Sequence, residues 1–255
     1  MMLPAERKQR IVELVTQRDG CSVAELAAKL DFSKATIRRD LQKLEDEGRI
    51  ERSHGGAVPA SSVGQERSYG QREVDRFDLK EAIGRRAIQL REDAQVVSFD
   101  AGTTTMAVAR AVPEGPSFEA VTNMPGLATV LLERGVDVTV TGGSLRPRTR
   151  ALVGPTAESF LDDHHVDLLY IGTNGIDAEA GLTTPNEAEA AVKSRLVDHA
   201  THVVLVADSS KFDEQSFVTF AGLTEIDTLV TDTEPTGRLA TPLDDAGVTI
   251  LLANS

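Results

Sequence analysis

Glycine- and threonine-rich loops that follow strand-like segments are the first candidates for chemistry in this chain. One of them, Asp100-Ala-Gly-Thr-Thr-Thr105, comes directly after the apolar segment Val96–Phe99. When a strand leads through such a turn into a helix, the backbone N–H groups and the hydroxyls of the turn point to one place. That arrangement suits the binding of a phosphate. The turn lacks both G-x-x-x-x-G-K-[ST] and G-x-G-x-x-G, so a nucleotide loop is not predicted. A plain tight connection is the alternative for this loop taken alone.

Three further loops of similar composition follow later strand-like segments. They are Thr122-Asn123, Gly142-Gly143-Ser-Leu-Arg146 and Gly172-Thr-Asn-Gly175. The carboxyl ends of parallel strands are where α/β sheets bind ligands, so we expect these loops to lie at one edge. Lys193 and Lys211 would add cations there, although a lysine on a helix or a turn is also an ordinary surface residue.

A second group of residues, near the N-terminus, is suited to reading DNA. The helix predicted from Lys34 to Glu47 turns polar and basic side chains outward near its start. Arginine recognises guanine edges bidentately, and threonine contacts bases or phosphates. The alternative is a capped helix with a solvated basic face, but the cap, the spacing and the following hairpin agree with each other. The expected DNA-binding residues are Ser22, Ser33, Lys34, Thr36, Arg38, Arg39, Arg52 and His54.

These DNA-reading residues need a scaffold of short helices. Pro4–Arg18 has helical spacing, and Ser22-Val-Ala-Glu25 has the form of a capping box that opens a second helix. Arg49–Arg52 and Ala57–Val58 flank a glycine turn and predict a hairpin. Three short helices followed by a hairpin form a winged helix-turn-helix, which we assign to residues 1–58.

The rest of the chain predicts a linker and an α/β domain. Residues 59–76 are rich in Ser, Gly, Gln and charge and predict a linker. In residues 77–255, strand-like segments alternate with helical patterns, which predicts a mostly parallel sheet covered by helices. The expected strands are Ala94–Phe99, Ala120–Thr122, Val136–Thr141, Val166–Gly172, His202–Ala207, Thr228–Thr231 and Val248–Leu252. The expected helices are Leu79–Leu90, Thr105–Val112, Pro125–Arg134, Thr156–Leu161, Glu187–His199 and Pro235–Ala246.

Charge divides the chain in a similar way. The 255 residues carry a net charge of −13, but residues 1–58 have 11 Lys+Arg against 10 Asp+Glu, whereas the remainder has 16 against 30. The acidity therefore belongs to the C-terminal part and does not exclude DNA binding by the N-terminal part. With 7 Lys against 20 Arg, the composition also resembles that of proteins adapted to high salt.

Other functional classes are disfavoured. The N-terminus has no apolar signal region and no apolar run has the length of a membrane span, so we expect a cytoplasmic protein with no membrane partner. The single Cys21 excludes an internal disulfide framework and a cysteine-rich metal cluster. Side chains of the adjacent His164 and His165 diverge on a helix or a strand, so we expect no metal site there and no cofactor.

Several longer stretches match a known family. In the N-terminal part they are Glu6-Arg-Lys-Gln-Arg-Ile11, Ser33-Lys-Ala-Thr-Ile-Arg-Arg-Asp-Leu41 and Arg49-Ile-Glu-Arg-Ser-His-Gly-Gly-Ala57. In the C-terminal part they include Asp100-Ala-Gly-Thr-Thr, Gly175-Ile-Asp, Gly181-Leu-Thr-Thr-Pro-Asn-Glu-Ala-Glu189 and Ala207-Asp-Ser-Ser-Lys211. With these stretches the chain resembles the DeoR family of transcriptional regulators over nearly its whole length.

The resemblance implies a sensor as well as a DNA reader. In that family the C-terminal domain is similar in fold to ribose-phosphate isomerases and glucosamine-phosphate deaminases, and it typically binds a phosphorylated sugar or sugar alcohol. By resemblance, the loop at residues 102–105 holds the phosphate, and other polar residues face the hydroxyls, the carbonyl or the phosphate. The implied effector-binding residues are Asp100, Gly102, Thr103, Thr104, Thr105, Asn123, Gly142, Gly143, Gly175, Glu187, Lys193 and Lys211.

We therefore expect a repressor of sugar or glycerol catabolism genes, with two or four subunits on an inverted-repeat operator in double-stranded DNA. A bound sugar phosphate would release the operator. The alternative is a sugar-phosphate isomerase or deaminase with an appended DNA-binding module, in which Glu187 or Glu189 is the base. The paired Asp and Glu of the isomerases are not clearly reproduced at residues 172–177, so we expect binding without turnover.

Overall fold

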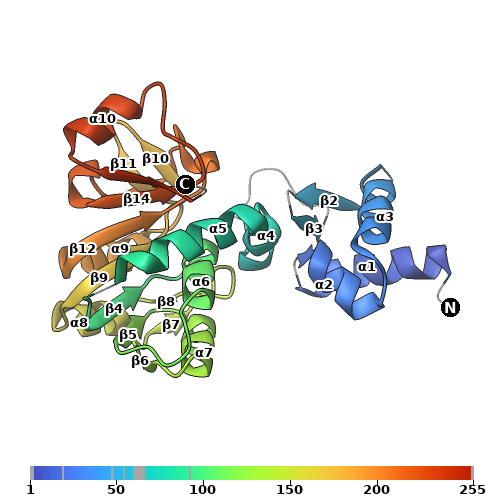
Figure 1. Cartoon of the computed structure of the whole chain (residues 1–255), viewed down its shortest axis with the longest axis horizontal. Helices are drawn as coiled ribbons and strands as arrows, with labels where there is room; N and C mark the ends of the chain where they lie inside the picture. Colours follow the sequence, from blue (N-terminus) through green and yellow to red (C-terminus); the bar gives the residue numbers. More distant parts are fainter. Residues whose placement is uncertain are drawn as a thin grey trace. The chain divides into compact units, whose positions relative to one another are not determined.

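A computed structural model describes residues 3–18, 20–46, 49–53, 55–59, 67–91 and 93–253. The chain divides into two compact units, Met1–Asp78 and Leu79–Ser255 (Figure 1). Among the described residues, no helix combines the length and the apolar character that crossing a membrane requires.

The first unit is a winged helix-turn-helix, as the sequence predicts. In the described residues before α4, its helices are α1 (Pro4–Arg18), α2 (Val23–Leu30) and α3 (Lys34–Asp46), and its strands are β1 (Cys21–Ser22), β2 (Ile50–Ser53) and β3 (Gly56–Pro59). The strands are antiparallel in the order β1-β3-β2, so β1 adds an unpredicted strand to the hairpin. The capping box at the start of α2 is confirmed, because Ser22 and Glu25 exchange both of its hydrogen bonds.

A buried ion pair holds α1 against α3 in this unit. Arg7 donates from Nε and Nη2 to the two carboxylate oxygens of Asp40, at 2.5 and 3.2 Å, and its guanidinium lies 4.5 Å from the centre of the Phe32 ring. Both members of the pair are buried, next to the apolar residues Ile37 and Leu41 of α3. The hydrogen bond to Asp40 raises the pKa of Arg7.

The segment expected as a linker contains a helix. α4 (Tyr69–Val74) begins at a capping box formed by Ser68 and Gln71, and both Tyr69 and Val74 are buried. The helix belongs to the first unit and packs on β1 and β3. The sequence pattern misses α4 because its two buried apolar side chains stand at opposite ends of six residues, which are too few to establish a helical period.

The second unit is built on a parallel sheet. In the described residues seven strands form it, in the order β15-β14-β12-β9-β4-β5-β6, and every neighbouring pair is parallel. All seven correspond to predicted strands, so the predicted architecture is confirmed. Their bounds are Val96–Phe99 (β4), Glu119–Thr122 (β5), Asp137–Val140 (β6), Val166–Ile171 (β9), Ala200–Val206 (β12), Thr228–Thr231 (β14) and Thr249–Leu252 (β15).

The α-helices of the second unit also follow the predicted order, with boundaries shifted by at most three residues except at α10. α10 begins at Ala240 rather than at the predicted Pro235. The bounds are Phe77–Ala87 (α5), Ile88–Arg91 (η1, a 3-10 turn), Thr103–Arg110 (α6), Pro125–Glu133 (α7), Pro155–Asp162 (α8), Glu187–Asp198 (α9), Ser209–Lys211 (η2, 3-10), Leu223–Glu225 (η3, 3-10) and Ala240–Asp245 (α10).

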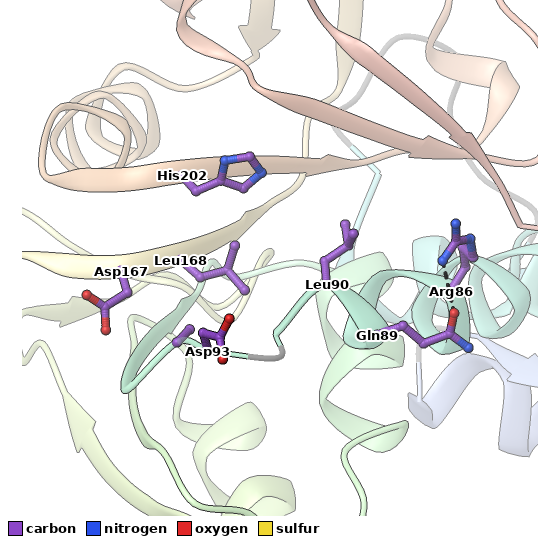
Figure 2. A pocket seen from close by; sticks show the side chains of 8 residues that line it. Arg86, Gln89, Leu90, Asp93, Asp167, Leu168 and His202 are labelled. Atoms are coloured by element: carbon purple, nitrogen blue, oxygen red, sulfur yellow. Dashed lines mark hydrogen bonds between the residues drawn. The ribbon is translucent and has the colours of Figure 1, made fainter.

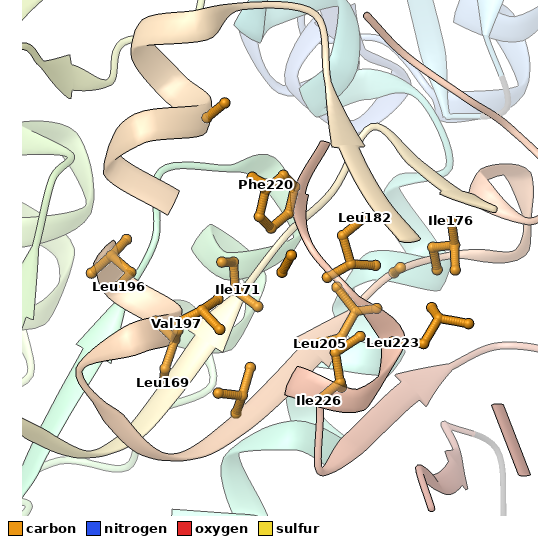
Figure 3. Packing of buried hydrophobic residues seen from close by; sticks show 14 of the residues in the cluster. Leu169, Ile171, Ile176, Leu182, Leu196, Val197, Leu205, Phe220, Leu223 and Ile226 are labelled. Carbon is orange, nitrogen blue, oxygen red and sulfur yellow. The ribbon is translucent and has the colours of Figure 1, made fainter. Parts of the chain in front are cut away.

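Two small sheets were not predicted. β10 (Gly175–Asp177), β11 (Gly181–Thr184) and β13 (Val218–Ala221) form an antiparallel sheet, and β7 (Ser144–Leu145) pairs with β8 (Leu152–Val153). Figure 3 shows how apolar side chains from the large sheet, the small sheet and α9 share one core. The strands are too short and too rich in Gly and Thr to show an apolar alternation.

Candidate functional site

The start of α3 is capped and faces solvent. The Ser33 hydroxyl accepts a hydrogen bond from the Thr36 N–H at 3.2 Å and lies 2.9 Å from the Thr36 hydroxyl. Lys34, Arg38 and Arg39 are exposed. Asp40 points inward to Arg7, so the acid next to the two arginines is already engaged in the core. The exposed face of α3 therefore presents three cations and two hydroxyls, which suits contact with DNA phosphates and base edges.

The other predicted DNA-binding residues that the structure describes have different placements. Arg52 of β2 is fastened to α3, because its Nη1 donates to Gln42 Oε1 at 2.6 Å and its backbone N–H donates to Glu45 Oε1 at 3.3 Å. Ser22 is buried and its hydroxyl is engaged with Glu25 in the α2 cap, so its place in the structure is internal. His54 lies outside the described residues.

A buried ion pair marks the carboxyl edge of the large sheet in the second unit. Asp100, directly after β4, pairs with Lys193 of α9, which also donates to the Gly172 carbonyl after β9 at 2.8 Å. The Gly172 N–H donates to Asp100 Oδ2 at 3.2 Å, while Oδ1 is buried and has no hydrogen-bond partner among the described residues. Burial raises the pKa of Asp100, and the Lys193 ammonium opposes this rise. The sequence predicted both residues for this edge, and the structure brings them together.

The first turn of α6 opens onto the same edge. Gly102 is its N-cap residue and, lacking a side chain, makes no side-chain cap. Among the described residues, the N–H groups of the first turn therefore have no capping hydroxyl or carboxylate. Thr105 is fully buried, and its hydroxyl donates to the carbonyls of Asp100 and Gly102, at 2.6 and 3.0 Å. Thr105 therefore shapes the loop, while Thr103 is buried and Thr104 is half-buried.

A second ion pair, which the sequence reasoning missed, lies beside the first. Glu189 of α9 is buried and pairs with Arg146 and with the Thr149 hydroxyl in the segment between β7 and β8. The predicted Glu187 is exposed. Helical spacing could have distinguished them, because Glu189 and Lys193 are four residues apart and share a face of α9, whereas Glu187 and Lys193 do not.

The remaining predicted residues have mixed placements. Asn123 is buried, and its Oδ1 accepts the Ala101 N–H at 2.8 Å, which ties the end of β5 to the loop after β4. Gly143, with a φ of 107°, passes so close to the Val153 carbonyl that a Cβ would lie 2.6 Å from that oxygen. The corresponding distance from Gly175 to the Glu214 carbonyl is 2.2 Å. Both glycines thus have packing reasons to be present.

Gly142 and Lys211 complete the predicted set. Gly142 follows β6 and also has a positive φ, 73°. Lys211 is half-buried at the end of η2, which follows β12, so both residues lie at carboxyl ends of sheet strands. Of the predicted residues, Asp100, Asn123, Lys193 and the loop at residues 102–105 form one connected network.

The histidines and the cavity at the other edge of the sheet are separate from this network. No group of three or more His, Cys, Asp or Glu is arranged around a common point for a metal ion in the part of the chain that the structure describes. His164 stacks on Phe160, whereas His165 meets His199 edge to face. The cavity of about 630 Å³ in Figure 2 lies at the amino ends of β4, β9 and β12, at the opposite edge from Asp100; it is lined by Arg86, Gln89, Leu90, Asp93, Ala94, Asp167, Leu168 and His202.

Family models match both units. Residues 7–63 match the DeoR-like helix-turn-helix domain, and residues 76–233 match the DeoR C terminal sensor domain. The HTH-type transcriptional regulator GlpR of Haloferax volcanii is 56% identical over 250 residues, which is 98% of each chain. The glycerol-3-phosphate regulon repressor of Escherichia coli is 31% identical and covers 92% of this chain and 93% of its own.

Similarity to solved structures is weaker. Ribose 5-phosphate isomerase A of Methanocaldococcus jannaschii is 15% identical, with a TM-score of 0.40, over 53% of this chain and 54% of its own. The full-length relatives carry the names of regulators and repressors, which favours a regulator over the isomerase or deaminase alternative. The chain belongs to the DeoR family of helix-turn-helix transcriptional regulators.

Proposed function

We propose that this chain is a transcriptional repressor that binds operator DNA through the exposed face of α3 and the hairpin β2–β3. Two or four subunits bind an inverted repeat, and a phosphorylated sugar or sugar alcohol bound by the second unit releases the operator. The name of the Escherichia coli relative supports glycerol 3-phosphate as the first effector to test. The target genes are those of sugar or glycerol catabolism.

One observation carries the effector site. The uncapped N–H groups at the start of α6 lie in the same loop as Asp100, whose Oδ1 is buried and without a partner among the described residues. A helix N-terminus favours an anion through its free N–H groups and its dipole. The free oxygen of Asp100 accepts a hydrogen bond from a hydroxyl. The two groups together fit a ligand that carries both a phosphate and hydroxyls.

Release of DNA requires that the effector bind one arrangement of the subunits better than the other. An effector with equal affinity for the DNA-bound and DNA-free arrangements shifts neither population. α5 begins before the division between the units, at Phe77, and continues to Ala87 in the second unit. We propose that α5 transmits the change, because it is a continuous helix across that division.

A substitution that fills the anion position tests the effector site. Gly102 has extended backbone angles, and a Cβ there meets only the Thr105 hydroxyl, at 3.0 Å. Gly102→Asp places a carboxylate at the N-cap. There it accepts hydrogen bonds from the N–H groups that we assign to the phosphate. We expect operator affinity to stay within about twofold and the effector response to fall about 100-fold, because a like charge now occupies the site.

Fluorescence anisotropy of labelled DNA from upstream of the gene, titrated with glycerol 3-phosphate, fructose 1-phosphate, ribose 5-phosphate and glucosamine 6-phosphate, measures this response. Glycerol and the free sugars are the controls for the phosphate, and Gly102→Ala is the control for added bulk without charge. A response that survives in Gly102→Asp removes the α6 start from the site. Conversion of ribose 5-phosphate or glucosamine 6-phosphate at about one per second, an ordinary enzyme rate, refutes binding without turnover.

A further inference from the structure

The strand β6 ends the large sheet with one side open. In the described part of the chain it pairs with β5 alone, and the Thr141 N–H, just after the strand, donates to the Thr122 carbonyl at 3.1 Å. Peptide groups alternate in direction along a strand, so those of Thr139 also face β5 and those of Val138 and Val140 face away. β6 thus offers a short row of backbone donors and acceptors to a partner strand.

Exposed apolar side chains occur on β6 and on the elements that precede and follow it in the chain. Val140 is 37% exposed, Leu132 on α7 is 58% exposed and Leu145 on β7 is 54% exposed. Proteins usually guard such edges with lysine, proline or an inward-pointing charge. β6 has none of these, since its one charged residue, Asp137 at the first position, is exposed. Exposed apolar groups beside an unguarded strand indicate a surface for association.

Charge indicates which partner fits. Residues 125–132 and 138–145 contain no ionisable side chain, although residues 59–255 carry 30 acidic against 16 basic residues. Two copies of so acidic a chain repel each other over most of their surface, and an uncharged area is where they approach at the lowest electrostatic cost. Asp137 is the one charged residue of β6, so a partner that recognises this chain by charge finds little to bind there. The uncharged surface therefore fits a second copy of the chain.

We propose that β6 pairs antiparallel with β6 of a second copy around a two-fold axis that passes through Thr139. In this register Val138 lies opposite Val140 of the second copy, and each pair exchanges two N–H···O=C bonds, since both residues turn their peptide groups outward. The interface is isologous and joins the two sheets into one. Leu132 and Leu145 lie at its borders. This contact would join the subunits of the proposed repressor. Only its effect on DNA binding rests on the proposed function.

Val140→Lys tests the pairing in the full-length protein without DNA or effector. Two lysines across the two-fold axis repel each other, so we expect the dissociation constant of the dimer to rise about 100-fold. Analytical ultracentrifugation over a range of concentrations measures it, and the molar mass of the largest species is expected to fall by half. The matched control is Thr249→Lys, an exposed threonine of β15 at the other edge of the sheet, which should associate like the wild type. Val140→Thr keeps the branched side chain and should also associate.

A second variant and the behaviour of the wild type complete the test of the β6 pairing. If Val140→Lys fails to fold by circular dichroism, Leu145→Glu tests the same surface on an exposed side chain outside the strand. A wild type that stays monomeric, an unchanged mass in the charged variants, or an equal loss in Thr249→Lys overturns the proposal. Because association is measured in the absence of DNA, a dimer that fails to bind operator refutes the proposed function while the interface stands. A monomer that binds operator and responds to effector refutes the β6 interface, while regulation of DNA binding by the effector stands.

Discussion

The exposed face of α3 and the carboxyl edge of the large sheet place their charged side chains in opposite ways. On α3, Lys34, Arg38 and Arg39 extend into solvent, and the neighbouring acid Asp40 is held inside by Arg7. At the carboxyl edge of the large sheet, Asp100 and Lys193 are buried and paired with each other. The first arrangement leaves cations available to a large external polyanion. The second fixes a small site before any ligand arrives, which limits the ordering that binding requires.

This difference separates stability from binding. Exposed charges contribute little to folding, typically less than about 1 kcal/mol each, so they can be changed to suit an operator. Removing one member of a buried pair leaves an uncompensated charge and destabilises the fold by about 3–5 kcal/mol. Substitutions on α3 should therefore act on DNA affinity, and substitutions at the sheet edge should act on the free energy of unfolding as well as on the effector.

The largest effect is expected for Lys193→Met. It removes the ammonium that contacts Asp100 and the Gly172 carbonyl and leaves the Asp100 carboxylate buried without a counter-charge. We expect the free energy of unfolding, measured by urea titration with circular dichroism, to fall by about 3–5 kcal/mol. Lys211→Met, at a half-buried position, is the control and should change it by less than about 1 kcal/mol.

The double variant Asp100→Asn with Lys193→Met refines this test. Removing both charges should recover part of the lost stability, because no buried ion remains. If Lys193→Met lowers the free energy of unfolding no more than Lys211→Met does, the ion pair at the sheet edge contributes no more to stability than a half-buried lysine. The contrast with the exposed cations of α3 then fails.

Arg39→Ala is expected to act on DNA alone. An arginine that contacts a base edge contributes about 1–3 kcal/mol, so operator affinity should fall about 10- to 100-fold, while unfolding and the effector-induced shift in melting temperature stay unchanged. Arg10→Ala, which removes an exposed arginine of α1 that is paired with Glu13, controls for the loss of one positive charge. Equal losses in the two variants would mean that net charge, rather than contact by α3, determines operator binding.

The parts of the fold that could be predicted from the sequence are those marked by apolar periodicity, helix caps and loop residues. α1, α2 and α3 have regular apolar spacing and recognisable caps, and the strands of the large sheet are continuous apolar runs between loops. Their order and the parallel pairing follow from alternation with helices. β10 and β11 escaped prediction because their hairpin is rich in Gly and Thr and has no apolar alternation. β13 escaped because it pairs with β11 from a distant part of the chain.

The candidate site was predictable in its loops but not in its ion pairs. Gly102 and Asp100 stand in a recognisable strand–turn–helix sequence, whereas the partnership of Glu189 with Arg146 joins segments more than 40 residues apart. Nothing local signals a pair of that kind. In the first unit, Ser22 was predicted among the DNA contacts, whereas the structure buries it and engages its hydroxyl in the capping box of α2.

Ser22 and Ser33 give the finest test of the contrast, because both cap helices of the same unit. Ser22 is buried, whereas Ser33 is exposed at the start of α3 beside Thr36. Ser22→Ala removes a capping hydroxyl from the core and should lower the free energy of unfolding by about 1 kcal/mol, with little change in the operator affinity of the folded protein. Ser33→Ala should lower stability by a similar or smaller amount and also weaken operator binding severalfold, since its hydroxyl lies on the face that we assign to DNA. Urea unfolding and operator anisotropy, measured on the same preparations, separate the two effects. If Ser22→Ala weakens the DNA complex as much as Ser33→Ala does, cap integrity rather than exposure on α3 governs binding, and the DNA-binding surface has to be redrawn to include the start of α2.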